Sequence, residues 1–531
     1  MAIDPLRRFY VALTARALRH RALFIVVGIV LLLVSMRQMP LIGRNLMPPM
    51  DTGIIKISWE MDANSSVAAA EKALARMEQI ILEQPGVTSV SSVVGSEPAV
   101  ISFGAGRLPQ QGLITVHLVD RFHRDQTIWD IEDALREKFR AIPGLLSADV
   151  FDFGATPLSS IRAPVDVMIS GPDIQELDRI GREIEQRFRE QVRGATSITR
   201  SWRLDSEEIG FITDPEKLAL YHISPAAVTA QLASAIRGVP ASVFRVPNED
   251  GLAVWLQLER DQRSAAEKLA TLSIVTPRGP VPLIELGRLE RRPAASVITR
   301  QGLQRTLDIQ VYRARRTISH MQEDVEKALA DIELPPGYSI SHEGEIKQMN
   351  ESFGRLGKAL LLGLLLLYFS LVPTFRSWAH PLTIMSAVPL GLIGAIWAML
   401  IAGKHGCMPA FMGMILLAGL VTKNSILLID FIAAARERGD SLHDALVGAV
   451  QIRTRPILMT AFSTIVGMIP IALQWAVGLE RLSPLAVVAI GGLFVATFLT
   501  MVYVPIFYSL FEDIRQRVRA LLPMHTEPAR S

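Results

Sequence analysis

The pattern of hydrophobic positions divides this chain into a membrane part and a large polar part. A helix needs about 20 apolar residues to cross a bilayer. Six segments are long enough: Ala22–Leu41, Leu356–Phe375, Pro381–Ala402, Pro409–Ala433, Ile457–Leu479 and Pro484–Phe511. No small-residue cleavage site follows the first segment, so we interpret it as a retained anchor and not as a signal peptide. The pattern therefore predicts six transmembrane helices.

Residues 42–353, between the first two apolar segments, show the periodicities of a mixed α+β region. Alternating apolar and polar residues predict strands, and apolar residues that recur every three or four positions predict helices. The first part follows the order strand, helix, strand twice: Ile54–Met61, Ser65–Gln84, Val87–Val94, Leu113–Val119, Thr127–Ala141 and Leu146–Phe151. Two such units form a ferredoxin-like split βαβ sandwich.

The same order returns later in this region, around an insertion. The second set is Val165–Ser170, Ile174–Arg189, Thr196–Trp202, Thr306–Tyr312, Ile318–Ile332 and Tyr338–His342. The insertion, at about Asp205–Arg292, has its own signals at Pro225–Arg237, Ala253–Leu258 and Ser264–Leu272, so we expect a separate small module. The expected organisation is a lead-in at 1–21, a helix at 22–41, one subdomain at 42–163, a second at 164–204 and 293–353, the insertion at 205–292, five helices within 354–511 and a tail at 512–531.

Basic residues orient the predicted helices. Thirteen arginines flank one end of them, four of which (Arg436, Arg438, Arg453 and Arg455) lie between the fourth and fifth; the others are Arg7, Arg8, Arg16, Arg19, Arg21, Arg376, Arg515, Arg517 and Arg519. The opposite short loops carry Lys404 and Arg481. The positive-inside rule therefore predicts that both termini are cytoplasmic and that residues 42–353 lie outside. Residues 5–20 form a basic amphipathic stretch, which we expect to lie along the membrane surface.

Composition excludes several classes of protein. Half of the residues are hydrophobic and 20% are charged, which is typical of a membrane protein with a large polar portion. The formal net charge of +3 gives no sign of a nucleic-acid partner. Cys407 is the only cysteine, so thiolate metal sites and disulfide frameworks are excluded. The sequence contains no phosphate loop, HExxH motif, nucleophile elbow or dinucleotide fingerprint, and the histidines are scattered. We therefore expect neither an enzyme nor a cofactor.

Methionines in the polar block leave one metal alternative open. Thioether sulfur binds soft metals such as copper and silver. The residues concerned are Met47, Met50, Met61, Met77, Met168, Met321 and Met349, and they show no ligand spacing. Core packing explains them better, and handling of copper or silver is kept as the lesser alternative.

Lys423 is the most informative residue. It lies midway along the apolar run from about Gly406 to Ala435. A lysine at this depth of a membrane helix raises the free energy of membrane insertion by roughly 2.5–3.5 kcal/mol. Such a residue usually faces a protein interior, pairs with carboxylates and marks an ion or proton path, although a purely structural ion pair is an alternative. Asp430 is seven residues on, about 10 Å along a helix. No carboxylate of this chain lies at a matching depth, so we expect the missing acid in another chain.

Four motifs then carry a family resemblance. They are Leu46–Gly53 after the first apolar segment, Gly419–Asp430 in the fourth, Arg453–Thr460 at the start of the fifth, and Gly491-Gly492 with Val504–Tyr508 in the sixth. Nearly the whole chain resembles the C-terminal half of a resistance–nodulation–division (RND) efflux permease of the hydrophobe/amphiphile type. The resemblance implies family helices seven to twelve, two periplasmic porter subdomains, and half of a docking (funnel) domain at 205–292.

The resemblance also implies roles for individual residues. Lys423 is similar to a lysine that pairs with two aspartates of the N-terminal half when they are ionised, and Asn424 would be its hydrogen-bonding neighbour. Thr460 matches a hydroxyl that assists the proton exchange. Arg453 matches a basic residue on the cytoplasmic side of the relay, although an orienting basic residue fits it as well. Asp430 is a possible helix-end acid, with a plain surface group as the alternative.

The expected function is half of a proton-motive-force-driven exporter of amphiphilic small molecules in the bacterial inner membrane. Nothing in this chain matches the two aspartates, so we expect one half of a split permease, the product of a broken gene, or an expressed fragment. The resemblance implies an N-terminal-half partner, a trimeric assembly, a periplasmic adaptor, an outer-membrane channel, and contact with membrane lipids. The alternatives are a heavy-metal (copper or silver) exporter and a non-transporting remnant or scaffold.

Overall fold

The computed structural model describes residues 4–95, 108–152, 163–245, 247, 251–263 and 266–521. The chain separates into two compact units, one made of residues 1–201 and 300–531 and the other of residues 202–299. Each unit is described by itself below.

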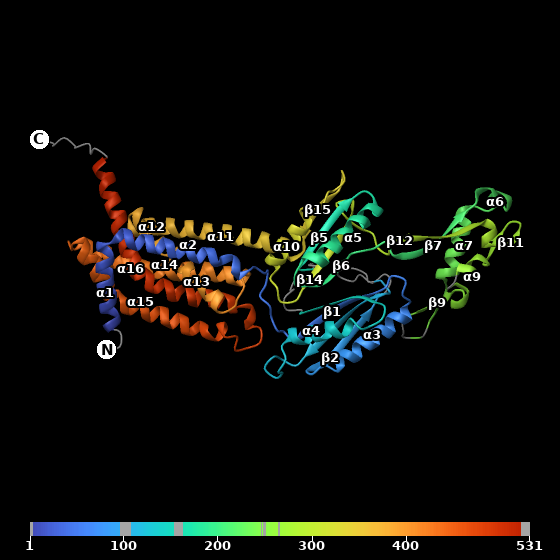
Figure 1. Ribbon diagram of the computed structural model, residues 1–531, viewed down its shortest axis with the longest axis horizontal. Coiled ribbons are helices and arrows are strands. Elements are labelled where there is room, and N and C mark those ends of the chain that lie inside the picture. The colour runs from blue at the N-terminus through green and yellow to red at the C-terminus, as the bar shows by residue number, and fades with distance from the viewer. Residues whose placement is uncertain are drawn as a thin grey trace. The chain divides into compact units, whose positions relative to one another are not determined.

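A bundle of long apolar helices forms the larger part of the first unit. Its elements are α1 (Asp4–Arg19), α2 (Arg21–Ile42), α11 (Gly344–Phe375), α12 (Ala379–Met385), α13 (Val388–Ile401), α14 (Met408–Glu437), α15 (Leu442–Ala472), η2 (Leu479–Arg481) and α16 (Ser483–Leu521). Six helical stretches of the described residues, with α12 and α13 counted as one, are long and apolar enough to cross a membrane. Each of them overlaps one of the six predicted segments, and Figure 1 shows them running side by side.

The bundle is tightest where α13 meets α16. A Cβ atom added at Gly394 of α13 would lie 2.2 Å from the carbonyl oxygen of Gly491 of α16. Only glycines allow backbones to approach so closely, as is common between membrane helices. This contact fixes α16 in the middle of the bundle, with α14 and α15 also packed against it.

Helix α15 differs from its prediction at the N-terminal end. It begins at Leu442, and the hydroxyl of Ser441 caps it by accepting a hydrogen bond from the backbone N–H of Asp444. Arg453 and Arg455, which were expected in the connection between two helices, therefore lie inside α15. Hydropathy misses this part because charged residues occupy its exposed face.

Subdomain A, named here for residues 54–152, is the first α+β sandwich. It consists of β1 (Ile54–Met61), α3 (Val67–Leu82), β2 (Val87–Val94), β3 (Gln111–Leu118), α4 (Ile128–Phe139) and β4 (Leu145–Asp152). The antiparallel sheet has the order β2-β3-β1-β4, which is ferredoxin-like, as predicted. Residues of β1 alternate between buried and half-buried, and the buried ones pack against α3 and α4.

Subdomain B, named here for residues 165–200 and 304–343, repeats this plan across the insertion. Its elements are β5 (Val165–Gly171), α5 (Ile174–Gln191), β6 (Ala195–Arg200), β14 (Gln304–Arg313), α10 (Ile318–Leu329) and β15 (Ser339–Glu343). Strand β14 pairs with β5 and β6, β15 pairs with β5, and the short β13 (Thr299–Gln301) adjoins β14. The predicted strand–helix–strand order is confirmed in this subdomain also.

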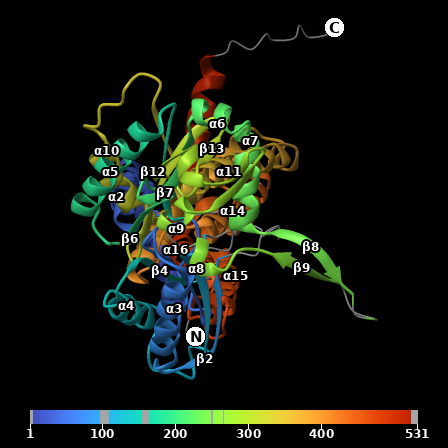
Figure 2. The ribbon, with the colours of Figure 1, turned by 90° about the vertical axis from the view of Figure 1, so that its right-hand side faces the viewer.

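The second unit, residues 202–299, contains short elements around a small core. They are β7 (Ser206–Thr213), α6 (Pro215–Leu220), α7 (Pro225–Arg237), β8 (Val239–Phe244), β9 (Leu252–Leu256), α8 (Arg260–Arg263), α9 (Ala266–Ala270), β10 (Ser273–Thr276), β11 (Gly279–Pro282), η1 (Leu283–Leu286) and β12 (Gly287–Ala294). Within this unit, the β8–β9 hairpin extends away from α6 and α7 (Figure 2). The predicted helix 264–272 begins outside the described residues, as does the end of the predicted tail, 522–531.

Candidate functional site

Helix α14 carries the predicted lysine on its outer surface. The side chain of Lys423 is exposed and, within the described ranges, takes part in no ion pair. Its neighbour Asn424 is buried in the bundle, 5% exposed. Asp430 lies two helical turns beyond Lys423 on the exposed side of α14, so the two charges share one face. The charge of Lys423 therefore points out of the part of the bundle that this chain supplies.

Helix α15 carries the other two predicted residues. The side chain of Thr460 is exposed, and its hydroxyl donates a hydrogen bond to the carbonyl oxygen of Ile457 at 3.0 Å. Arg453 is half-buried, with its guanidinium carbon 5.6 Å from the centre of the Phe431 ring of α14. This cation–π contact joins the two helices at one end of the bundle. The structure thus puts all five predicted residues on α14 and α15, which pack against each other.

The outer faces of these helices lack the packing expected of a finished bundle. Only 11% of the most apolar stretch of α15 is buried, against 61% for α16. Large apolar side chains, among them Met459 and Phe462, are exposed beside Thr460. Apolar exposure alone is normal for a lipid-facing helix, whereas an exposed lysine at mid-span is costly. The face with Lys423 therefore has the character of a contact surface.

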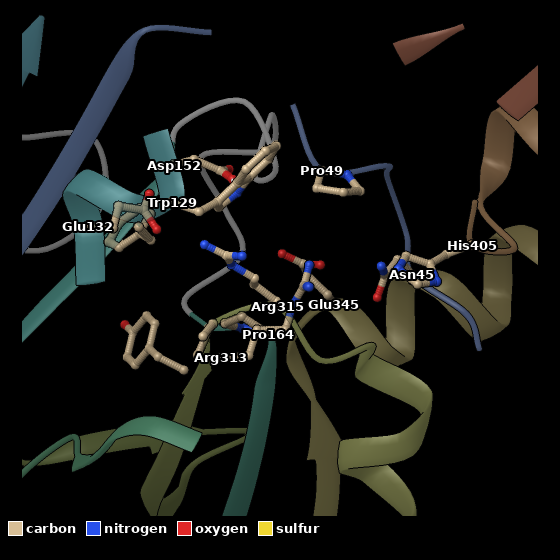
Figure 3. A pocket seen from close by; sticks show the side chains of 14 residues that line it. Asn45, Pro49, Trp129, Glu132, Asp152, Pro164, Arg313, Arg315, Glu345 and His405 are labelled. Atoms are coloured by element: carbon tan, nitrogen blue, oxygen red, sulfur yellow. The ribbon is translucent and has the colours of Figure 1, made fainter. Parts of the chain in front are cut away.

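A second candidate site is a cavity of about 330 Å³ between subdomains A and B. Its lining includes the aromatic rings of Trp129, Phe151 and Tyr312, and Phe151 stacks on Tyr312 with ring centres 6.0 Å apart. Figure 3 shows Glu132, Trp129 and Asp152 on one side and Asn45 and His405 on the other. Sequence analysis did not identify this cavity.

Charged side chains of both signs line the cavity: the carboxylates Glu132, Asp152 and Glu345, and the guanidinium groups of Arg313 and Arg315. Glu345, the second residue of α11, is 1% exposed, and neither of its carboxylate oxygens has a hydrogen-bond partner. Glu132 is 3% exposed and forms a 2.9 Å ion pair with Arg136. Burial raises the pKa of Glu132 to about 8, the charge of Asp152 adds to this rise, and Arg136 opposes it. The sequence signal that could have found this site is an acid, Glu132, amid the apolar positions Ile128, Ile131 and Leu135 of α4.

Six of the seven methionines singled out in the sequence are buried, and Met47 is half-buried. Met61 and Met77 belong to the core of subdomain A, and Met168, Met321 and Met349 are at most 8% exposed. Among the described residues, no group of three or more histidine, cysteine, aspartate or glutamate side chains is arranged to hold a metal ion.

Comparisons with known proteins agree with this architecture. The model of the AcrB/AcrD/AcrF family matches residues 2–512. Among solved structures, two crystal forms of a heavy metal efflux pump superpose with a TM-score of 0.84 at 23% sequence identity. The match covers 97% of this chain and 52% of the pump chain, so this chain spans about half the length of that structure. At this identity the likeness shows the fold, whereas the family match covers nearly the whole sequence. The chain belongs to the AcrB/AcrD/AcrF family of RND membrane transporters.

Proposed function

We propose that this chain is the C-terminal half of a proton-driven exporter of amphiphilic small molecules. The single observation that carries the proposal is the exposed Lys423 within an apolar helix. A partner chain with carboxylates at the same depth would neutralise the lysine and remove most of its insertion cost of roughly 2.5–3.5 kcal/mol. Such a partner is the N-terminal half of the permease.

The proposed relay uses the difference between ionised and protonated carboxylates. Ionised partner carboxylates hold the ammonium of Lys423, and protonation releases it, because the groups titrate as a coupled set. Thr460 would offer its hydroxyl to the exchange, Asn424 would be a hydrogen-bonding neighbour of Lys423, and Arg453 would be the basic residue on the cytoplasmic side of the relay. Asp430 would serve as a helix-end acid. Each proton that crosses gains about 2.3 kcal/mol per 100 mV of membrane potential.

The proposed substrate path runs through the α+β subdomains. The cavity between subdomains A and B supports an amphiphilic substrate, because it combines aromatic walls with charged groups of both signs, the carboxylates Glu345, Glu132 and Asp152 and the arginines Arg313 and Arg315. An apolar body would lie against the rings, and a polar or charged group would face these side chains. By kinship, the assembly would be trimeric, with the termini in the cytoplasm, the subdomains in the periplasm, and an adaptor and outer-membrane channel attached.

Resistance of a pump-deficient host to dyes, detergents and antibiotics tests this function. The chain would be expressed alone and with an N-terminal half, each with Lys423 and with Lys423→Ala, and membrane abundance would be measured throughout. We expect resistance only from the pair of halves with Lys423. Export by this chain alone, or full export with Lys423→Ala, would contradict the proposal.

The same assay separates the two alternatives. A non-transporting remnant would give no resistance in any combination at normal abundance. A copper or silver exporter would raise tolerance to silver, and that tolerance would fall in a series of Met→Ile variants of the buried methionines.

A further inference from the structure

The loop after β3 of subdomain A holds the far end of the helix that carries Thr460. Helix α15 ends at Ala472, and Gln474 follows it with a left-handed backbone (φ 58°). The guanidinium of Arg121 donates hydrogen bonds to the carbonyl oxygens of Gln474 and, at 3.4 Å, Ala476. The C-terminus of a helix carries a partial negative charge, so a cation is favoured at this place.

Arg121 also forms an ion pair with the connection between α15 and α16. Its Nε lies 2.8 Å from Oε1 of Glu480, and the two side chains are 18% and 5% exposed. The other oxygen of Glu480 accepts the backbone N–H of Gly478 at 2.8 Å, which fixes the turn at φ 87°. A charge pair so little exposed is weakly screened, and removal of one partner leaves a buried charge. Arg121 therefore joins the loop after β3 to the connection between α15 and α16, and both segments are ordered.

The Arg121 loop is rigidly attached to subdomain A. Asp120 accepts the backbone N–H of Phe122 at 2.9 Å, and Arg124 donates to the carbonyl oxygen of Val119 at 3.0 Å. Arg124 also pairs with the buried Asp51, whose second oxygen accepts the N–H of Ile128 at the start of α4 at 3.0 Å. A displacement of Arg121 would thus be passed to β3 and α4, and α4 contributes Trp129 and Glu132 to the cavity.

From this geometry we propose that Arg121 is a positioning residue that transmits movement of α15 to subdomain A. From Thr460 to Leu473 the helix is about 20 Å long. A rotation or shift of α15 at the relay would pull the loop through Arg121 and Glu480, and would change the shape of the cavity. The inference rests on the proposed transport function, because it supplies the link between its two sites.

Charge reversal in the complete pair of halves tests the link, with ethidium efflux from cells of a pump-deficient host as readout. We expect Arg121→Glu and Glu480→Arg each to lower the maximal rate about tenfold at equal abundance, within the usual range of coupling energies. The half-saturating ethidium concentration should stay unchanged, because neither residue lines the cavity. The double variant Arg121→Glu/Glu480→Arg should restore the rate. The control is Arg140→Glu, whose ion pair with Glu137 is exposed and whose reversal should change nothing.

Full efflux in Arg121→Glu would overturn the inference and leave the proposed function standing. The inference would also be overturned if both single variants lose efflux and the double variant does not regain the wild-type rate. If wild-type protein gives no efflux either, the proposed function fails and the inference falls with it.

A second measurement checks the contact without transport. In the purified chain in lipid nanodiscs, Glu480→Gln should speed amide hydrogen exchange both at residues 120–124 and at residues 474–482. A change confined to the second segment would mean that the two segments are not linked, and would overturn the inference.

Discussion

Subdomains A and B share one fold but are joined to the helical bundle in different ways. Subdomain B is held by hydrogen bonds to the segment that follows α2: Arg44 donates its N–H to the hydroxyl of Ser319 at 2.8 Å, and Ser319 donates its N–H to the carbonyl oxygen of Arg44 at 3.1 Å. Asn45 caps α10 by accepting the N–H of Ile318 at 2.9 Å. Subdomain A contacts the connection between α15 and α16 through the side chain of Arg121.

The difference indicates which subdomain is free to respond to the helices. Hydrogen bonds of 2.8–3.1 Å fix subdomain B to the segment that follows α2, and β15 continues directly into α11. The ion pair of subdomain A can be lengthened or re-formed at lower cost. We therefore expect subdomain B to move with α2 and subdomain A to follow α15.

The largest effect is expected inside subdomain A, from Asp51→Ala. The change leaves Arg124, 5% exposed, without its carboxylate and removes the acceptor of the Ile128 N–H at the start of α4, which should cost about 3–5 kcal/mol of unfolding free energy. Thermal unfolding and hydrogen exchange of the purified chain would report the loss. Faster exchange should appear in α4 and β3 and not in α10. Equal loosening of both subdomains would show that they unfold together, and would remove the distinction.

A pH effect on subdomain A should come next in size. The folded-state pKa of Glu132 is raised to about 8, above that of an exposed glutamate. The folded state therefore holds a proton that the unfolded state releases, so the stability from this group is present at low pH and is lost as the pH rises towards 8.

The unfolding temperature of the wild-type chain should thus fall between pH 5 and pH 8 relative to that of Glu132→Gln. Parallel pH profiles would contradict the expectation. The exposed Glu137, which pairs with Arg140, offers the matched control Glu137→Gln.

The smallest effect should come from the joint of subdomain B. Asn45→Ala removes the acceptor for the first N–H of α10, which costs about 1 kcal/mol for a helix cap. Hydrogen exchange should increase at the start of α10 and stay unchanged in subdomain A. The control is Ser66→Ala, which removes the cap of α3 and should act on subdomain A only. If Asn45→Ala instead speeds hydrogen exchange in subdomain A and not in α10, the segment at Asn45 does not hold subdomain B to the bundle.

Local patterns in the sequence predict much of this fold. Strands β1 and β2 and helix α7 begin and end at the predicted residues, because alternation, helical periodicity and a serine cap are local signals. The six apolar segments were recognised for the same reason. The start of α15 was missed because Arg453 and Arg455 interrupt its hydropathy.

The sites are harder to predict because their contacts are distant in sequence. Asn45 and Ile318 are 273 positions apart, and Arg121 and Gln474 are 353 positions apart, so no periodicity indicates either pair. Lys423 was identifiable from the sequence, because a charged side chain in an apolar segment is costly to insert into a membrane. The roles of Thr460, Asn424, Arg453 and Asp430 stay predictions, since the groups that would meet them are not in this chain.

The central claim is that Lys423 moves protons in exchange for substrate. The most direct measurement is proton flux across proteoliposomes that contain both halves, with a pH gradient imposed and ethidium added as substrate. Wild-type protein should collapse the gradient faster when ethidium is added, and Lys423→Ala should show no such acceleration at equal protein content. Substrate-dependent proton flux that persists in Lys423→Ala would contradict the account.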